Sequence, residues 1–166
     1  MLLAAVVCMA GKSYAQQYSN DKYDVYVLPE LQLRDDLMHQ IHNIVDNASF
    51  DRKFNYIIYS STDDVASSNT YLNIENITGT YCPYMNSVGY VSVDNVLFVI
   101  KDIPSVLYVL NDRTKEFKCI NKQSIKMYII KDPYLMWHYN FTYKGELVFQ
   151  GFVDSRRGIK VIPFIK

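Results

Sequence analysis

One stretch of this chain, residues 34–49, has the apolar spacing of a helix, while most of the remainder has the spacing of strands. In RDDLMHQIHNIVDNAS the apolar residues recur with a 3.6-residue period, which predicts an amphipathic helix over 35–48. Asp35 or Asp36 can cap its start, and an earlier start at Pro29 stays open. The preceding stretch, YDVYVLPELQL at 23–33, alternates apolar and polar residues and predicts a strand. Because Pro29 lacks an N–H, this strand is expected to be an edge strand or to end there.

The chain beyond the helix is expected to be β to its end. Hairpin turns are predicted at Asp94-Asn95, at NDRT (111–114) and at Lys144-Gly145, with a polar loop at 60–70 and an irregular segment at 78–87. No spacer is long enough for β-α-β crossovers, so the sheet should be mainly antiparallel. Segments with strand patterns are 23–33, 54–59, 71–77 (the weakest), 89–93, 96–100, 105–110, 115–120, 125–130, 135–143, 146–153 and 159–165, and eight to ten of them are expected to form strands.

These patterns predict an α+β fold, with one amphipathic helix packed on a mainly antiparallel sheet of roughly eight to ten strands. Residues at the apolar positions of both periods are expected to form the core. They are Val25, Val27, Leu37, Ile41, Ile44, Ile58, Val91, Phe98, Leu107, Trp137 and Phe149.

The first fifteen residues have the pattern of a signal peptide. Residues 2–10 are apolar throughout, a run too short for a membrane helix, which needs roughly 20 residues. The Ser-Tyr-Ala at 13–15 fits a signal-peptidase site before Gln16, which predicts residues 1–15 as signal peptide and 16–166 as a single mature domain. No Lys or Arg precedes the apolar run, and a buried N-terminal strand or helix is the alternative. The predicted location is the periplasm, the cell surface or the extracellular space.

Composition limits the partners. Basic and acidic residues are equal in number, 17 each, whereas nucleic-acid binders usually carry a basic surplus. Neither nucleic-acid binding nor stable membrane insertion is expected, and no cofactor is indicated. The hydrophobic content of 49% indicates a folded chain rather than a disordered one. With 15 tyrosines, the chain also favours a sheet with half-wet faces.

Two cysteines remain after the predicted cleavage, Cys82 and Cys119. An even pair in an oxidising compartment predicts one disulfide bond. The alternatives are two inert buried thiols or a reactive thiol, although neither cysteine has a partner at CxxC spacing.

Four polar residues of the predicted helix fall on one face, opposite its apolar stripe: Asp35, His39, His42 and Asp46. Two histidines and two carboxylates are ligands that a divalent metal can use. The other interpretation is the solvated side of an amphipathic helix, and since no second element supplying ligands is evident, no metal site is predicted.

The segment around His138 alternates aromatic and polar residues. His138, Asn140 and Thr142 are expected on one face of a strand, with the aromatic residues on the other. The aromatic face is either core or a stacking platform for a sugar or peptide. The candidate ligand-binding residues are accordingly Trp137, Tyr139, Tyr81 and Tyr84.

Enzyme motifs are mostly absent, since the sequence has no GxSxG, HExxH, P-loop or GxGxxG pattern. No catalytic residue is assigned, and no resemblance to a known family is evident. The leading hypothesis is an exported, non-catalytic binding or interaction module that recognises an envelope protein or a glycan. The alternative is a small envelope hydrolase using paired carboxylates, for which Asp63, Asp64 and Asp94 are candidates only because such pairs need no fixed spacing.

Overall fold

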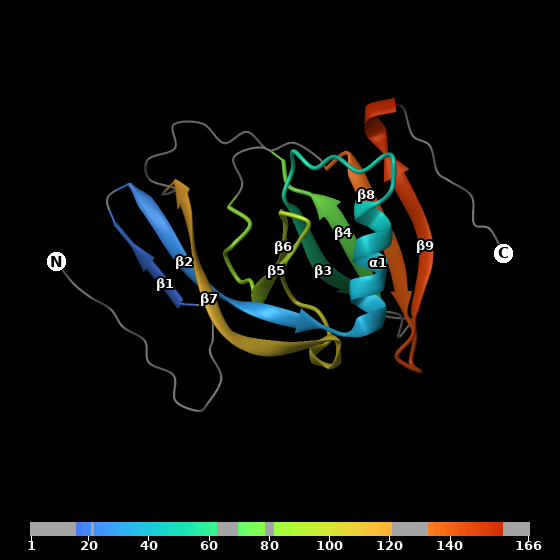
Figure 1. Cartoon of the computed structure of the whole chain (residues 1–166), viewed down its shortest axis with the longest axis horizontal. Helices are drawn as coiled ribbons and strands as arrows, with labels where there is room; N and C mark the ends of the chain where they lie inside the picture. The colour runs from blue at the N-terminus through green and yellow to red at the C-terminus, as the bar shows by residue number, and fades with distance from the viewer. Residues whose placement is uncertain (1–15, 21, 63–69, 79–81, 121–132, 158–166) are drawn as a thin grey trace.

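The computed structural model describes residues 16–20, 22–62, 70–78, 82–120 and 133–157. They form one helix and a mixed, mostly antiparallel nine-strand sheet, which confirms the α+β class (Figure 1). The elements are β1 (Gln16–Ser19), β2 (Tyr23–Leu33), α1 (Asp35–Val45), β3 (Tyr56–Thr62), β4 (Thr70–Asn76), β5 (Gly89–Val93), β6 (Val96–Ile100), η1 (Ser105–Leu107), β7 (Tyr108–Ile120), β8 (Leu135–Phe141), β9 (Leu147–Asp154) and η3 (Ser155–Arg157).

The strands follow the order β1-β2-β5-β6-β3-β4-β8-β9, and β7 pairs with β2 off this path. The β2–β5 and β3–β6 pairs are parallel, and the others are antiparallel. The two parallel pairs bring strands that are distant in sequence side by side. The turn motifs and the two-residue periodicity of the sequence therefore predicted the strands but not their order in the sheet.

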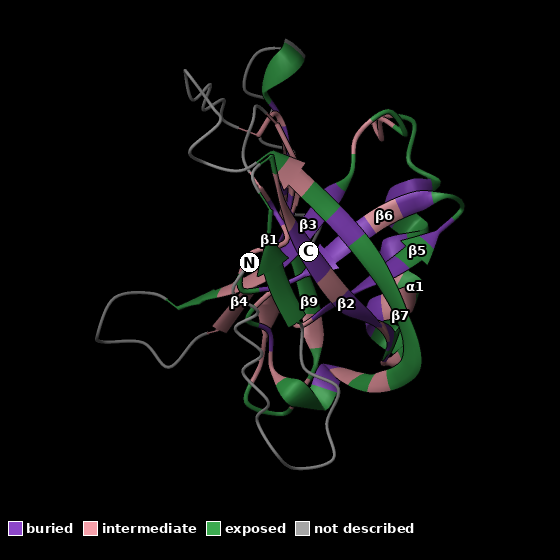
Figure 2. Ribbon diagram, turned by 90° about the vertical axis from the view of Figure 1, so that its left-hand side faces the viewer, coloured by how far each residue is buried: buried purple, intermediate pink, exposed green. Residues whose placement is uncertain are grey.

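The predicted turn at NDRT is wrong, because β7 is one strand that pairs with β2 on both sides of this segment. Leu110 lies opposite Leu31 and Thr114 opposite Pro29, so residues 111–113 face the single residue Glu30 as a bulge. Most of β7 remains exposed along its length (Figure 2). Pro29 lies inside β2, which is neither an edge strand nor interrupted there, and the register shift accommodates the missing N–H.

The other two predicted turns are confirmed. Asp94 and Asn95 both have positive φ, 49° and 65°, and connect β5 to β6. Gly145, with φ of 80°, lies in the turn between β8 and β9. The helix is shorter than predicted and ends at Val45, where the N–H of Asp46 still bonds the carbonyl of His42. Arg34, not Asp35 or Asp36, is its N-cap and makes no side-chain capping hydrogen bond, while Oδ1 of Asp36 accepts a hydrogen bond from the N–H of Leu37 in the first turn at 2.9 Å.

Two hydrophobic cores lie on opposite faces of the sheet. The larger, which we call the helix-side core, packs the buried stripe of α1 against the strands, with Tyr56, Ile58 and Phe98 fully enclosed. The smaller, the disulfide-side core, consists of Tyr26, Leu28, Tyr90, Val99 and Phe117, with Ile77, Cys82, Tyr84, Met85, Leu97 and Cys119 packed against it.

Most of the predicted core residues are buried, and two differ. Val27 is half-buried, because its partners across the ribbon, Gln16 and Glu116, are exposed and do not cover it. Phe149 is 47% exposed, because it lies on β9 at the end of the strand order and contacts the Tyr139 ring from one side.

Several predictions fall outside the described residues: the signal peptide, most of the loop at 60–70, Tyr81 and the strands at 125–130 and 159–165. Within the described part, no helix is long and apolar enough to span a membrane.

Candidate functional site

The four metal-ligand candidates lie exposed along α1 and at its C-terminal cap, as a solvated helix face requires. His39 Nδ1 is 3.1 Å from the side-chain nitrogen of Asn43, one turn further along the helix. Among the described residues, no group of three His, Cys, Asp or Glu side chains is placed to hold a metal ion. The structure therefore gives no ligands to add to Asp35, His39, His42 and Asp46.

The aromatic stacking candidates that the structure describes are core residues. Trp137 and Tyr139 are each 3% exposed, and the Trp137 ring stacks on Phe152 at 4.7 Å. Tyr84 is half-buried and stacks on Phe117 at 4.7 Å. The period-2 pattern correctly gave Trp137 and Tyr139 one face of the strand, and that face packs inward, so neither is exposed as a platform for a ligand.

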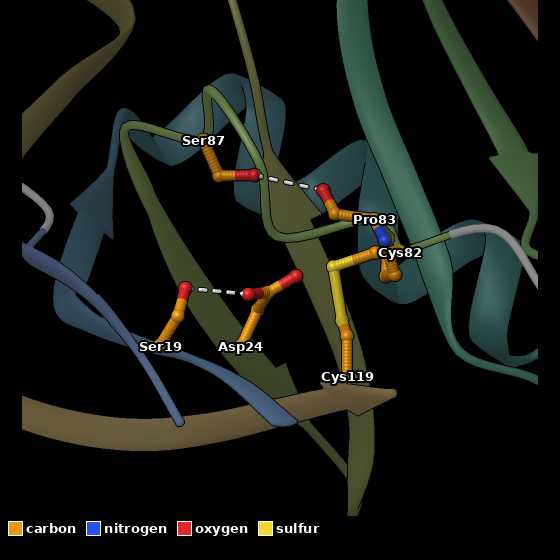
Figure 3. Close-up of a disulfide and its surroundings, with 6 residues drawn as sticks. All are labelled: Ser19, Asp24, Cys82, Pro83, Ser87 and Cys119. Atoms are coloured by element: carbon orange, nitrogen blue, oxygen red, sulfur yellow. Dashed lines mark hydrogen bonds between the residues drawn. A yellow bond between two sulfur atoms is a disulfide. The ribbon is translucent and has the colours of Figure 1, made fainter. Parts of the chain in front are cut away.

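Cys82 and Cys119 form a disulfide with their Cα atoms 5.7 Å apart, as predicted. The bond joins the turn that starts at Cys82 to the end of β7 (Figure 3). Within that turn, the hydroxyl of Ser87 donates a hydrogen bond to the carbonyl of Pro83 at 3.0 Å. The bridge thus holds the turn over the disulfide-side core, and it is consistent with an oxidising environment.

The same face of the sheet has a polar region on β3, β4 and β8, which we call the polar face. It consists of Tyr59, Ser61, Asn73, Glu75, Lys101 and His138. Cross-strand register puts Tyr59, Asn73, His138 and Gly151 in one row, because each lies opposite the next. Since side chains alternate along a strand, this row points away from Ile58, Ile74 and Trp137 of the helix-side core.

A chain of hydrogen bonds orients His138. Its Nδ1 donates to Oδ1 of Asn73 at 2.6 Å, and Nδ2 of Asn73 donates to the hydroxyl of Ser61 at 2.8 Å. A carbonyl oxygen can only accept, so Nδ1 carries the proton and the neutral ring has its lone pair on Nε2. Burial lowers the pKa of His138, which favours this neutral form. His138 therefore presents a hydrogen-bond acceptor that Asn73 holds in place.

Glu75 occupies the next row. The Tyr59 hydroxyl donates to Oε2 of Glu75 at 3.2 Å. Burial raises the pKa of Glu75, while this hydrogen bond and the charge of Lys101 act in the opposite direction. Burial, together with the charge and hydrogen bond of Glu75, raises the pKa of Tyr59 to about 12. With Lys101 beside Glu75 and His138 neutral, the polar face has little net charge.

The space beside His138 is open. Gly151 lies opposite His138, and a Cβ at Gly151 would meet no other atom within 4 Å. The register shifts between His138 and Tyr139, which is a bulge on the β9 side of the pair. Bulges often re-aim side chains beside functional sites. Val148 and Val153 lie on β9 on either side of Gly151, opposite Asn140 and Met136.

Asn140 completes this surface. It lies two residues from His138 on the same face of β8, as the alternation predicted. Its Oδ1 is enclosed and has no hydrogen-bond partner. An unsatisfied buried acceptor costs about 1–3 kcal/mol. Such a cost next to an oriented histidine and an open gap marks this place as a candidate ligand site.

Alternation in the sequence predicted His138 and Asn140 on one face but indicated no function for that face. Ser61, Asn73 and Glu75 were not predicted, because they join His138 through strand pairing between segments far apart in the chain. The available sequence signal was the alternation of polar residues in 71–77, which specifies neither the neighbouring strands nor the register of their pairing.

No protein-family model matches the chain, and no characterised protein or solved structure is significantly similar to it.

Proposed function

We propose that the protein is an exported, non-catalytic binding module whose ligand, an envelope protein or a glycan, sits on the polar face beside His138. Export is supported by two independent features: the apolar run ending in Ser-Tyr-Ala at 13–15, and the disulfide between Cys82 and Cys119.

The observation that carries the binding role is the pairing of an oriented acceptor with open space. Nε2 of His138 has a fixed direction because Nδ1 is held by Asn73, and the space over Gly151, the residue opposite His138 on β9, is open. Side chains that are locked by other hydrogen bonds bind a ligand without first losing conformational entropy. A purely structural histidine would gain nothing from an adjacent gap.

The alternative, a hydrolase with paired carboxylates, is favoured by one feature, the raised pKa of Glu75. Its cross-strand row has one other acid, Glu30, and the intervening residues are Tyr90, Val99 and Ile57. Four strand spacings of roughly 4.8 Å separate the two carboxylates by about 19 Å. Glycosidase pairs are about 5–10 Å apart, so Glu30 cannot be the partner of Glu75.

Capture from the host envelope tests the binding role. The immobilised chain should retain a ligand that is identified by mass spectrometry and glycan-array screening, and His138→Gln should weaken that retention. His39→Gln, at an exposed histidine of α1, is the matched control and should leave it unchanged. Equal retention by wild type and His138→Gln would contradict a role for the polar face.

Glu75→Gln separates the two functions, because it removes the acid and keeps an oxygen that accepts the Tyr59 hydrogen bond. A binding module should retain its ligand in this variant. A hydrolase should lose turnover of a glycoside substrate while still binding it, and turnover by the wild type would overturn the non-catalytic assignment.

A further inference from the structure

We propose that the ligand of the polar face is a neutral saccharide, whose ring lies over Gly151 and one of whose hydroxyls donates a hydrogen bond to Nε2 of His138. This inference rests on the proposed function and assigns the ligand class to the same site. Three properties of the surface support it: its hydrogen-bond acceptors, its charge and its shape.

The polar groups around the gap match hydroxyls better than other ligand groups. Nε2 of His138 is an acceptor, and so is Oδ1 of Asn140, two residues further along the same face of β8. A hydroxyl can donate, so a molecule with several hydroxyls can satisfy both groups. A ligand with only carbonyls would leave His138 unpaired.

The charge of the surface disfavours ions. Burial lowers the pKa of His138, so at neutral pH the ring has no charge with which to attract an anion. Glu75 and Lys101 interact with each other, so neither is left as a single unbalanced charge. An anionic or cationic ligand would lose its hydration without gaining an opposite charge.

The shape of the surface is also suited to a sugar ring. Val148 and Val153 lie on β9 on either side of Gly151, opposite Asn140 and Met136, and the space above Gly151 is open. A sugar ring presents C–H groups on its face and hydroxyls at its edge. The face can pack against the valines and the glycine backbone while an edge hydroxyl reaches the imidazole.

Asn140 links binding to a local rearrangement. Its enclosed Oδ1 lacks a donor, so a turn of the amide toward the gap would allow a second hydroxyl to supply one. His138 and Asn140 lie two residues apart on one strand, about 7 Å along β8. One ring can span the two positions.

Chemical-shift perturbation in ¹⁵N-labelled protein tests the inference. The probes are the methyl glycosides of glucose, galactose, mannose and N-acetylglucosamine, with glucuronate as a charged counterpart. At least one neutral glycoside should shift the Gly151 amide and the His138 ring resonances in a saturable way, and glucuronate should not. Gly151→Val should weaken that binding by about tenfold or more, because it fills the gap. Its Tm should stay close to that of the wild type, since a Cβ there meets no neighbour.

Ser92→Val is the control, because Ser92 is an exposed strand position on β5 and should leave the binding unchanged. The ligand class is wrong if no neutral glycoside shifts Gly151, if only glucuronate does, or if Gly151→Val binds as tightly as the wild type. A peptide or protein captured through His138 alongside silent glycosides would overturn the saccharide assignment and keep the binding module. No His138-dependent ligand of any kind would overturn both.

Discussion

The two cores of this protein lie on opposite faces of one sheet and are closed in different ways. The helix-side core is covered by α1, whose apolar stripe supplies Leu37, Ile41, Ile44 and Val45. The disulfide-side core has no helix among the described residues, and a turn tied by Cys82–Cys119 packs over its aromatic side chains. The larger core can depend on apolar area alone, whereas the smaller one gains a covalent restraint.

Substituting one phenylalanine in each core should give the largest difference. Phe98 is fully buried, with its ring 5.4 Å from that of Tyr56 and 6.4 Å from that of Phe50, so Phe98→Ala should lower the free energy of unfolding by about 3–5 kcal/mol. Phe117 is 7% exposed in a much smaller cluster, and Phe117→Ala should cost about half as much. Urea denaturation of both variants measures this, and equal losses would contradict the ranking of the two cores.

Removing the disulfide should have the next largest effect and should act on one core first. The bond closes a loop with a sequence separation of 37, so Cys82→Ala/Cys119→Ala should lose about 2–4 kcal/mol of stability. Amide exchange should accelerate at Tyr26 and Tyr90 more than at Ile58. The wild type with reductant is the matched control, and two free thiols in the unreduced, denatured wild type would refute the bond.

The sequence predicted the helix-side core better than the disulfide-side core, and the reason is locality. The stripe of α1 and the alternation around Ile58 and Phe98 are patterns within single segments. The disulfide-side core joins β2, β5, β6 and β7, and its partners are set by a parallel pair and by the bulge opposite Glu30. Neither leaves a periodic signal, and NDRT resembled a turn because bulges and turns favour the same polar residues.

The polar face was predictable to the same limited extent. Alternation put His138 and Asn140 together, but the partner Asn73 comes from a strand pair that no short-range pattern specifies. Trp137 was a candidate ligand-binding residue for the same reason. A period of two separates the faces of a strand without saying which face is buried.

Substitutions at two glycines test how closely β5 packs against β2. A Cβ at Gly89 would lie 2.6 Å from the side chain of Leu31 and 2.6 Å from the carbonyl oxygen of Pro29. Because a backbone atom cannot give way easily, Gly89→Ala should destabilise the protein by about 1–3 kcal/mol. Gly151→Ala is the control, since a Cβ there has free space and should change stability little. Thermal unfolding measures both, and similar Tm values for the two variants would contradict this account.

The smallest effect should come from the protonation of His138. Burial lowers its pKa, so as the pH falls through about 6.5 the unfolded chain binds a proton that the folded chain does not. The stability contributed by the neutral ring is therefore complete above that pH and is lost below it. Burial raises the pKa of Glu75, so the folded chain binds the carboxyl proton at a higher pH than the unfolded chain does. Protonation of Glu75 therefore favours the folded state as the pH falls, opposite to the effect of His138.

These two groups can be separated, because His138→Gln removes the imidazole and leaves Glu75 in place. The groups facing His138 across the strands, Asn73 and Gly151, are uncharged, and the charged groups of the polar face are Glu75 and Lys101. Lowering the pH from 7.5 to 5.5 should reduce the Tm of the wild type by about a degree or two more than that of His138→Gln. His39→Gln, on the exposed side of α1, should behave as the wild type. If His138→Gln loses as much as the wild type over this interval, the imidazole is not the group that titrates, and the neutral acceptor on the polar face would lose its support.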